Sequence, residues 1–162
     1  VDITILSQKL RESLKHEDFI ILDSAPGFGK EAVSAMKVCK EAILVTTPDI
    51  PSVTDVMRGK KVLQQLNVDI LGVVINMVTG KKFELTRNEI KELLDLPVLA
   101  EIPFSEKFRE SLARKKPLVL YEKHSPIVVE FLELGSLLTG EPYKSPKVSL
   151  LSRFLSIFSR FS

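Results

Sequence analysis

Four places in the sequence hold residues that could bind a metal ion, a phosphate or a flat ring, and each follows a short apolar run. Asp23 comes directly after the first run, and Gly27 lies four residues later. A carboxylate at the tip of a buried strand can hold a metal-bound water, and a nearby glycine lets the backbone approach a phosphate. An ordinary turn broken by Pro-Gly would show the same residues. Both interpretations stay open at this point.

The other three places offer polar and apolar groups of different kinds. Thr46–Asp49 follows the second run, where a turn and a helix cap are the simpler interpretation. Asn76 follows the third run, and its side-chain amide could bond the edge of a base or merely cap the strand. Pro103 and Phe104 follow the fourth run and could form the wall of a flat ligand site or cap the next helix. Taken together, these residues indicate a binding site more strongly than any of them does alone.

The elements expected to position these residues alternate along the chain. Short continuous apolar runs are typical of strands buried on both faces, and they occur at 19–22, 42–45 and 70–75, with a weaker fourth strand expected at 97–102. Helical spacing occurs at 3–14, 31–40, 52–66 with Ser52 as N-cap, 86–94, 105–114 and 125–138. This alternation predicts an α/β fold with a three-layer parallel sheet. In such sheets ligands bind beyond the carboxyl ends of the strands.

Composition predicts one globular core with a short tail. The 162 residues are 44% hydrophobic, so we expect one domain over 1–140, a linker at 141–148 and a helix at 149–162. The lone Cys39 excludes an internal disulfide framework and is consistent with a reducing compartment. We interpret Cys39 as a small, partly buried residue and not as a nucleophile. No run reaches the ~18 apolar residues that a membrane-spanning helix needs.

At this point a resemblance to a known family becomes clear. The segment FIILDSAPG at 19–27 resembles the second nucleotide-sensing segment of the MinD/ParA family of P-loop ATPases, with Ala and Pro exchanged. EAILVTTPDIPSVTDVMR at 41–58, the strand at 70–76 and the segment at 98–104 are similar to further motifs of that family, in the same order. The resemblance covers most of the chain. It implies the three-layer parallel sheet of the SIMIBI type of P-loop NTPase.

On the phosphate side, the resemblance implies roles for four residues. Asp23 is the candidate catalytic residue and contacts Mg²⁺ through water, and Gly27 is the hinge that senses the γ-phosphate. Pro48 and Asp49 shape the loop on the nucleotide side. The implied cofactors are ATP and Mg²⁺.

On the base side, the resemblance implies that Asn76 bonds the adenine edge and that the backbone around Pro103 and Phe104 lies against the base. Met77 departs from the family, in which many members have arginine at this position. Adenine contact through Asn76 survives that change, but stacking by a guanidinium group does not.

The chain does not contain the family's P-loop. No GxxxxGKS or GxxxxGKT segment occurs in the 162 residues, and Gly29-Lys30 lacks the upstream glycine and the following hydroxyl residue. The start at Val1 falls within a helical pattern, so we expect the C-terminal portion of a longer ATPase, with a degenerate relative as the alternative. We expect this chain alone not to hydrolyse ATP, since the P-loop holds the phosphates.

The last fourteen residues predict an amphipathic helix that binds a membrane surface. One helical face carries apolar side chains and the other carries serine and arginine. The residues assigned to membrane binding are Leu150, Leu151, Arg153, Phe154, Leu155, Ile157, Phe158, Arg160 and Phe161. Burying each apolar side chain yields about 1–2 kcal/mol, and ordering the helix costs about 1 kcal/mol per residue. A single tail therefore binds weakly, and two tails in a dimer bind better. Packing of this helix on the domain or on another subunit is the alternative.

The charge distribution favours anionic lipids as the partner of the tail. Four basic residues and one acidic residue follow Gly140, so the tail carries +3 and the body −1 of an overall +2. The family resemblance implies an ATPase that forms a homodimer with ATP and cycles on the cytoplasmic face of the cell membrane. It positions division or other machinery there, with regulatory partners that the sequence does not name. A ParA-like ATPase that binds DNA without sequence specificity and a non-catalytic scaffold are the alternatives, but a body charge of −1 disfavours DNA.

Overall fold

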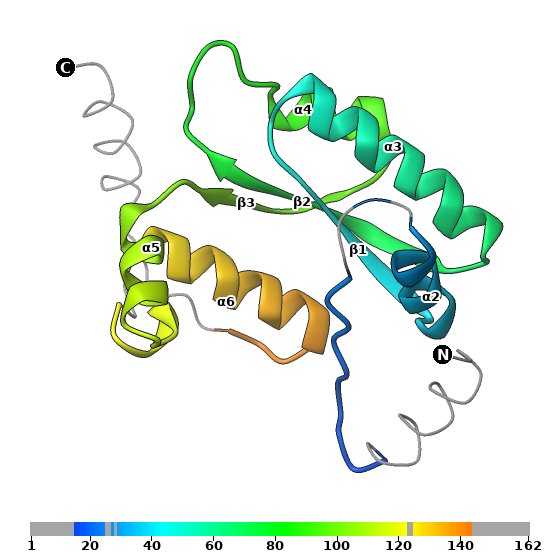
Figure 1. Ribbon diagram of the computed structural model, residues 1–162. Coiled ribbons are helices and arrows are strands. Elements are labelled where there is room, and N and C mark those ends of the chain that lie inside the picture. Colours follow the sequence, from blue (N-terminus) through cyan, green and yellow to red (C-terminus); the bar gives the residue numbers. More distant parts are fainter. Residues whose placement is uncertain (1–14, 25–26, 28, 123–124, 144–162) are drawn as a thin grey trace. The chain divides into compact units, whose positions relative to one another are not determined.

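A computed structural model of the chain describes residues 15–24, 27, 29–122 and 125–143 (Figure 1). The chain forms two compact units, Val1–Glu101 and Ile102–Ser162, and their boundary falls inside the third strand. In the described part, the elements in chain order are α2 (Lys30–Val38), β1 (Glu41–Thr46), α3 (Ile50–Gln65), β2 (Asp69–Val78), α4 (Arg87–Leu94), β3 (Val98–Pro103), α5 (Glu106–Ala113), the 3₁₀-helix η1 (Leu118–Leu120) and α6 (Pro126–Thr139).

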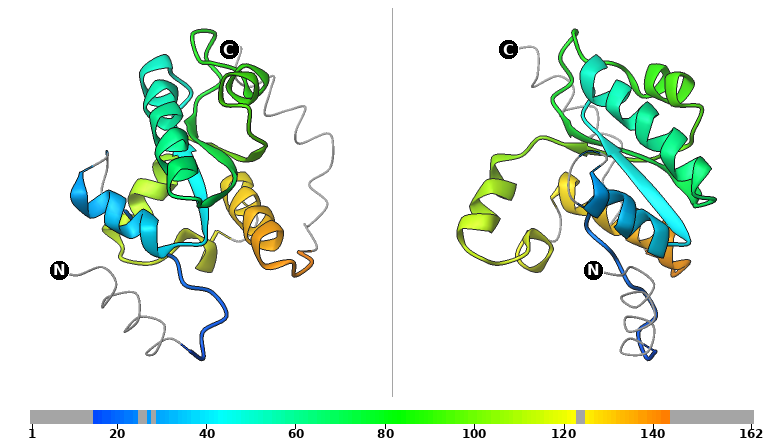
Figure 2. Two further views of the ribbon diagram at one scale, coloured as in Figure 1. Left: turned by 90° about the vertical axis from the view of Figure 1, so that its right-hand side faces the viewer. Right: turned by 45° about the vertical axis from the view of Figure 1, so that its right-hand side comes forward.

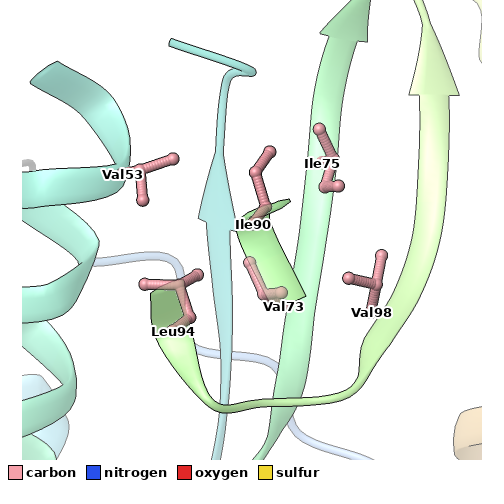
Figure 3. Close-up of a cluster of buried hydrophobic side chains, with 6 residues drawn as sticks. All are labelled: Val53, Val73, Ile75, Ile90, Leu94 and Val98. Atoms are coloured by element: carbon pink, nitrogen blue, oxygen red, sulfur yellow. The ribbon is translucent and has the colours of Figure 1, made fainter. Parts of the chain in front are cut away.

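The sheet of the first unit has the order β1-β2-β3. β1 and β2 pair in parallel, from Glu41 opposite Asp69 to Thr46 opposite Ile75. The arrows of all three strands point the same way in Figure 3. α3 connects β1 to β2 and α4 connects β2 to β3, as parallel neighbours require. The predicted α/β fold with a parallel sheet is confirmed.

A buried cluster joins this sheet to the two helices on one of its faces. α3 and α4 lie side by side there, as the right-hand view of Figure 2 shows. The cluster is drawn in Figure 3 and consists of Val53, Val73, Ile75, Ile90, Leu94 and Val98. Ile90 and Leu94 are one helical turn apart, so α4 directs both into the cluster. These helices and the sheet supply two of the three expected layers within the first unit.

Gly72 lets β3 approach β2 closely. Its φ is +154°, and a Cβ atom at this position would lie 2.5 Å from the Pro97 carbonyl oxygen. The Val73 N–H donates to the same oxygen at 2.9 Å. A side chain at position 72 would therefore push on the backbone that begins β3.

The helix starts follow local hydrogen bonding. Asp49, and not Ser52 as predicted, is the N-cap of α3, because its carboxylate accepts a hydrogen bond from the Ser52 backbone N–H. α4 begins at a complete capping box, in which the Thr86 hydroxyl and the Glu89 carboxylate each bond the other residue's backbone N–H. Both devices satisfy N–H groups that the first helical turn leaves unpaired.

The strand predicted at 19–22 is not present. Phe19, Ile20 and Ile21 lie outside any helix or strand, and the Ile21 side chain is 89% exposed. An apolar run becomes a strand only when a neighbouring strand accepts its backbone hydrogen bonds, and no described residue pairs with this segment. The prediction considered only the apolar side chains of the run and assumed that a neighbouring strand would pair with it.

The second unit begins with the last two residues of β3 and continues with the helices α5, η1 and α6. The Phe108 ring of α5 stacks on the Phe131 ring of α6, with centroids 5.8 Å apart. α6 ends at Gly140, whose φ of +73° is the left-handed conformation common after helices. Among the described residues, no helix is both long and apolar enough to cross a bilayer. The predicted first helix, most of the linker and the whole tail lie outside the described residues.

Candidate functional site

The loop from β1 to α3 is held by a network around the Asp49 carboxylate. The Thr47 hydroxyl donates to this carboxylate, and the Ser52 backbone N–H and hydroxyl donate to it at 2.9 and 3.0 Å. The bond from Thr47, followed by that from the Ser52 N–H, holds the pKa of the Asp49 carboxyl below its ordinary value. Asp49 is therefore ionised at neutral pH and fixes the course of this loop.

Asn76 lies near the end of β2, two residues inside the strand. Its Oδ1 accepts a hydrogen bond of 2.9 Å from the Met77 N–H, and Met77 has a φ of +59°. Among the described residues, no acceptor is bonded to the Asn76 side-chain NH₂. Oδ1 also keeps a second lone pair. The side chain thus offers one donor group and one acceptor in a half-buried position.

The strand register brings these two features to the same edge of the sheet. Thr46 is paired with Ile75, so Thr47 and Asn76 are the next residues along two neighbouring parallel strands. The loop after β1 is also tied to the loop after β2, because the Leu85 N–H donates to the Pro48 carbonyl oxygen at 3.0 Å. The carboxyl ends of β1 and β2 therefore form one connected edge, which we call the strand-end edge.

Asp23 and Gly27 belong to the first unit but to no helix or strand. Asp23 is exposed, and within the described part of the chain its carboxylate has no hydrogen bond or ion pair. Gly27 has a φ of +84°, and a Cβ atom there would meet nothing within 4 Å. The backbone at Gly27 therefore has the conformation and the room expected of a glycine hinge. Its assignment as the γ-phosphate sensor stays a prediction.

Pro103 and Phe104 fall in the second unit, directly after the point where the units divide. Pro103 ends β3, and the Phe104 ring is 47% exposed. Next to them, Ser105 and Pro126 help to line an open pocket of about 580 Å³. Their place against a base stays a prediction.

Sequence reasoning missed the organisation of the loop between β2 and α4. The Glu84 carboxylate accepts hydrogen bonds from the Thr79 N–H at 3.1 Å and from the Gly80 N–H at 2.7 Å. At the base of the loop, the Arg87 guanidinium bonds the Val98 carbonyl oxygen at 2.6 Å and pairs with Glu101 at 3.2 Å. No periodic pattern marks these residues, since each acts through a single contact.

Comparisons with known proteins agree with the fold. Residues 4–138 match the family model described as ParA, NUBPL iron-transfer P-loop NTPase. An ATP-binding protein of Methanocaldococcus jannaschii is 31% identical over 142 residues, which cover 87% of this chain and 54% of that protein. An iron-sulfur cluster carrier protein of Haemophilus influenzae is 28% identical over 151 residues, covering 85% of this chain and 41% of the carrier.

The solved structures lead to the same family. The septum site-determining protein MinD of Pyrococcus horikoshii, complexed with Mg-ADP, superimposes with a TM-score of 0.77 at 33% identity, over 85% of this chain and 56% of that chain. The chain spans about half the length of the curated relatives it matches. A family match over most of its residues and a shared fold lead to one conclusion: this chain belongs to the ParA/MinD family of P-loop NTPases.

Proposed function

We propose that this chain supplies the base-binding and phosphate-sensing part of a MinD-like ATPase. The observation that carries the proposal is the side-chain NH₂ of Asn76, which has no partner among the described residues, at the strand-end edge next to the loop that Asp49 fixes. It is supported by 33% identity to a MinD whose structure holds Mg-ADP. The proposal assigns adenine recognition to this chain's own residues.

Adenine offers the hydrogen-bonding groups that Asn76 can match. Its exocyclic amine donates and a neighbouring ring nitrogen accepts, so a side-chain amide can bond both at once. In this chain the free NH₂ of Asn76 donates to the ring nitrogen, and the second lone pair of Oδ1 accepts from the amine. The bond from Met77 to Oδ1 restrains the amide and selects this orientation.

The phosphate side of the proposal rests on Asp23 and Gly27. Mg²⁺ usually keeps several waters and needs one or two carboxylates in addition to phosphate oxygens, and the exposed Asp23, which has no partner among the described residues, fits that donor set. Bound Mg²⁺ would neutralise charge on the phosphates. Gly27 would supply a backbone N–H to the γ-phosphate, and a Cβ atom at this position would meet no described atom within 4 Å. We expect these 162 residues alone to show no Mg²⁺-dependent ATP hydrolysis, because the sequence in hand contains no P-loop motif.

Base recognition can be tested on the chain itself with saturation-transfer NMR. A base held by a few hydrogen bonds should bind with a Kd on the order of 1 mM. We expect transfer to the adenine protons of ATP, and a loss of about tenfold in affinity for Asn76→Ala. Asn88→Ala, which changes an exposed asparagine on α4, is the matched control and should bind as the parent does. Equal transfer in Asn76→Ala and the parent would remove Asn76 from the site.

Membrane attachment is the second part of the proposal, and it rests on the sequence of residues 149–162. The helix expected there presents Leu and Phe on one face and Arg153 and Arg160 on the other, which suits the surface of an anionic bilayer. We propose a peripheral protein on the cytoplasmic face of the cell membrane. ATP-driven homodimerisation would present two tails and raise the membrane affinity through effective concentration.

Co-sedimentation with anionic vesicles tests this part. Phe154→Glu and Phe158→Glu should each abolish sedimentation, because a carboxylate in the apolar face costs more than one tail can offset. The circular dichroism spectrum of both variants should match that of the parent. If both variants sediment with vesicles as the parent does, the tail has another role.

Iron transfer, the activity in the description of the matching family model, finds no support in the cysteine content. Iron–sulfur clusters are held by several thiolates, whereas this chain has Cys39 alone. Cys39 is half-buried, its thiol donates to the Ala35 carbonyl oxygen, and burial raises its pKa. Both the burial and the raised pKa disfavour the thiolate, and a thiolate is what a cluster needs.

A further inference from the structure

The loop between β2 and α4 ends in a basic and aromatic tip. The segment 79–85, which we call the tip loop, protrudes beyond the end of β2 in Figure 1. The Glu84 N–H donates to the Lys81 carbonyl oxygen at 3.0 Å, so Lys82 and Phe83 occupy the centre of a β-turn. The Phe83 side chain is 82% exposed, and the Lys81 ammonium lies 5.8 Å from the centre of its ring.

Hydrogen bonds within the tip loop hold its conformation. The Glu84 carboxylate turns back and accepts hydrogen bonds from the Thr79 hydroxyl at 2.6 Å and from the Thr79 and Gly80 backbone N–H groups. Burial raises the pKa of Glu84, but these bonds outweigh it and leave the pKa below its ordinary value. The one acidic side chain of the loop is thus engaged with the backbone at its base.

The tip loop carries two lysines, Lys81 and Lys82. Neither Lys81 nor Lys82 forms an ion pair with any residue that the structure describes, although several lysines and arginines elsewhere in the described part do so. An exposed ring alone is common on protein surfaces. An exposed ring at the centre of a hydrogen-bonded turn, beside two ammonium groups that form no ion pair in the described part of the chain, suits a partner that is both anionic and apolar.

We propose that the tip loop contacts an anionic lipid bilayer directly, with the Phe83 ring at the acyl boundary and Lys81 and Lys82 among the phosphate headgroups. The headgroup region offers negative charge above and hydrocarbon below, within a depth of about 5–10 Å. Membrane-surface segments bury phenylalanine, tryptophan and leucine side chains at this level of the bilayer. The inference concerns described residues and does not depend on the tail helix at 149–162.

Nucleic acid fits the same residues less well. Backbone phosphates would satisfy the lysines, but stacking on a base is a contact that arginine-rich or multi-aromatic surfaces make, and the tip has one ring. The internal hydrogen bonds of the loop also favour a bilayer contact, since a preordered turn loses little entropy when its ring enters the interface.

Fluorescence of Phe83→Trp tests the contact, because the chain contains no tryptophan of its own. The full chain, with an N-terminal hexahistidine tag, is held on phosphatidylcholine vesicles by a nickel-chelating lipid, with and without phosphatidylglycerol. This attachment keeps the protein at the surface whether or not the tail binds. Leu93→Trp, at a position that is 46% exposed on α4 of the same unit, is the matched control.

We expect Phe83→Trp emission to shift to the blue on vesicles with phosphatidylglycerol and to be quenched by brominated acyl chains, whereas Leu93→Trp stays unchanged. In untagged protein, Lys81→Gln and Lys82→Gln should each weaken binding to the same vesicles about fivefold, and Phe83→Ser about tenfold. Added salt should reduce the effect of the lysines.

Three results would overturn the inference. The first is an unshifted Phe83→Trp spectrum on surface-held protein, and the second is an equal shift in both tryptophan variants. The third is a shift with a DNA oligonucleotide but none with vesicles, which would favour nucleic acid as the partner. If the tail does not bind membranes, the untagged parent will not sediment with vesicles. If the chain does not bind the base, saturation transfer to ATP will be absent.

Discussion

Replacing Gly72 with alanine should destabilise the first unit strongly, although it adds one methyl group. The new Cβ atom would lie 2.5 Å from the Pro97 carbonyl oxygen and 2.8 Å from two side-chain atoms of Leu99. Leu99 can rotate away, but Pro97 presents backbone. β3 must therefore move, and the hydrogen bond from the Val73 N–H to Pro97 must lengthen.

The magnitude follows from two costs. Overpacking a close contact costs about 1–3 kcal/mol, and a φ of +154° is a conformation that residues with a Cβ atom rarely adopt, which costs about 1 kcal/mol more. We expect a loss of about 3 kcal/mol in the free energy of unfolding. With a urea m-value of about 2 kcal/mol per molar, the midpoint should fall by about 1.5 M.

Urea unfolding followed by circular dichroism measures this loss, with Gly135→Ala as the matched control. Gly135 lies inside α6, and a Cβ atom there meets nothing within 4 Å. Alanine should therefore raise stability by about 0.5–1 kcal/mol through helix propensity. If the two units unfold in separate transitions, each substitution should move its own transition. A Gly72→Ala variant within about 0.5 kcal/mol of the parent would refute the close approach of β2 and β3.

Three further predictions concern the elements around the strand-end edge. Leu94→Ala should cost about 2–5 kcal/mol in thermal or urea unfolding, since this side chain is fully buried in the cluster under the sheet; a cost below about 1 kcal/mol would contradict that packing. Thr86→Ala removes the capping box of α4 and should cost about 1 kcal/mol, with faster amide exchange confined to the first turn of that helix; unchanged exchange there would argue against the cap. Asp49→Asn keeps a good N-cap, so its free energy of unfolding should match that of the parent at neutral pH. Below about pH 4 its free energy of unfolding should fall less steeply with decreasing pH than that of the parent. The pKa of Asp49 is lowered in the folded state, so its contribution is present above the unfolded pKa of about 3.9 and is lost as pH falls through the folded value. Unfolding from pH 2 to pH 6 measures this difference, and an identical pH dependence in both proteins would show that the Asp49 charge does not stabilise the loop.

The regular elements of the first unit were predictable because their signals are local. The apolar runs that became β1 and β2 and the helical spacing that placed Ile90 and Leu94 on one face each lie within a few residues. The run at 19–22 carries the same signal, but the strand predicted there is not present. A strand also depends on a neighbouring strand, which the run itself does not specify. Where the partner is distant, the pattern alone is insufficient.

The candidate site shows the same division. The sequence indicated an amide at the strand tip and an acidic loop after β1, since strand ends in parallel sheets carry ligand groups. It did not indicate that Met77 would bond the Asn76 oxygen, or that Asp49 would cap α3 in place of Ser52. Both depend on which side-chain oxygen lies within about 3 Å of a backbone N–H, and that distance is set by the folded backbone.

The central claim, that Asn76 reads the adenine base, is tested most directly by the base preference of Asn76→Asp. A carboxylate has two acceptor oxygens and no donor, so it matches the paired N–H donors of guanine and loses the bond to the adenine ring nitrogen. Oδ1 can still accept from the Met77 N–H, so the backbone should keep its course. Saturation-transfer titration with ATP and GTP should show the parent preferring ATP by about tenfold and Asn76→Asp preferring GTP. A parent that does not distinguish the two bases, or a variant that still prefers ATP as strongly, would contradict the account.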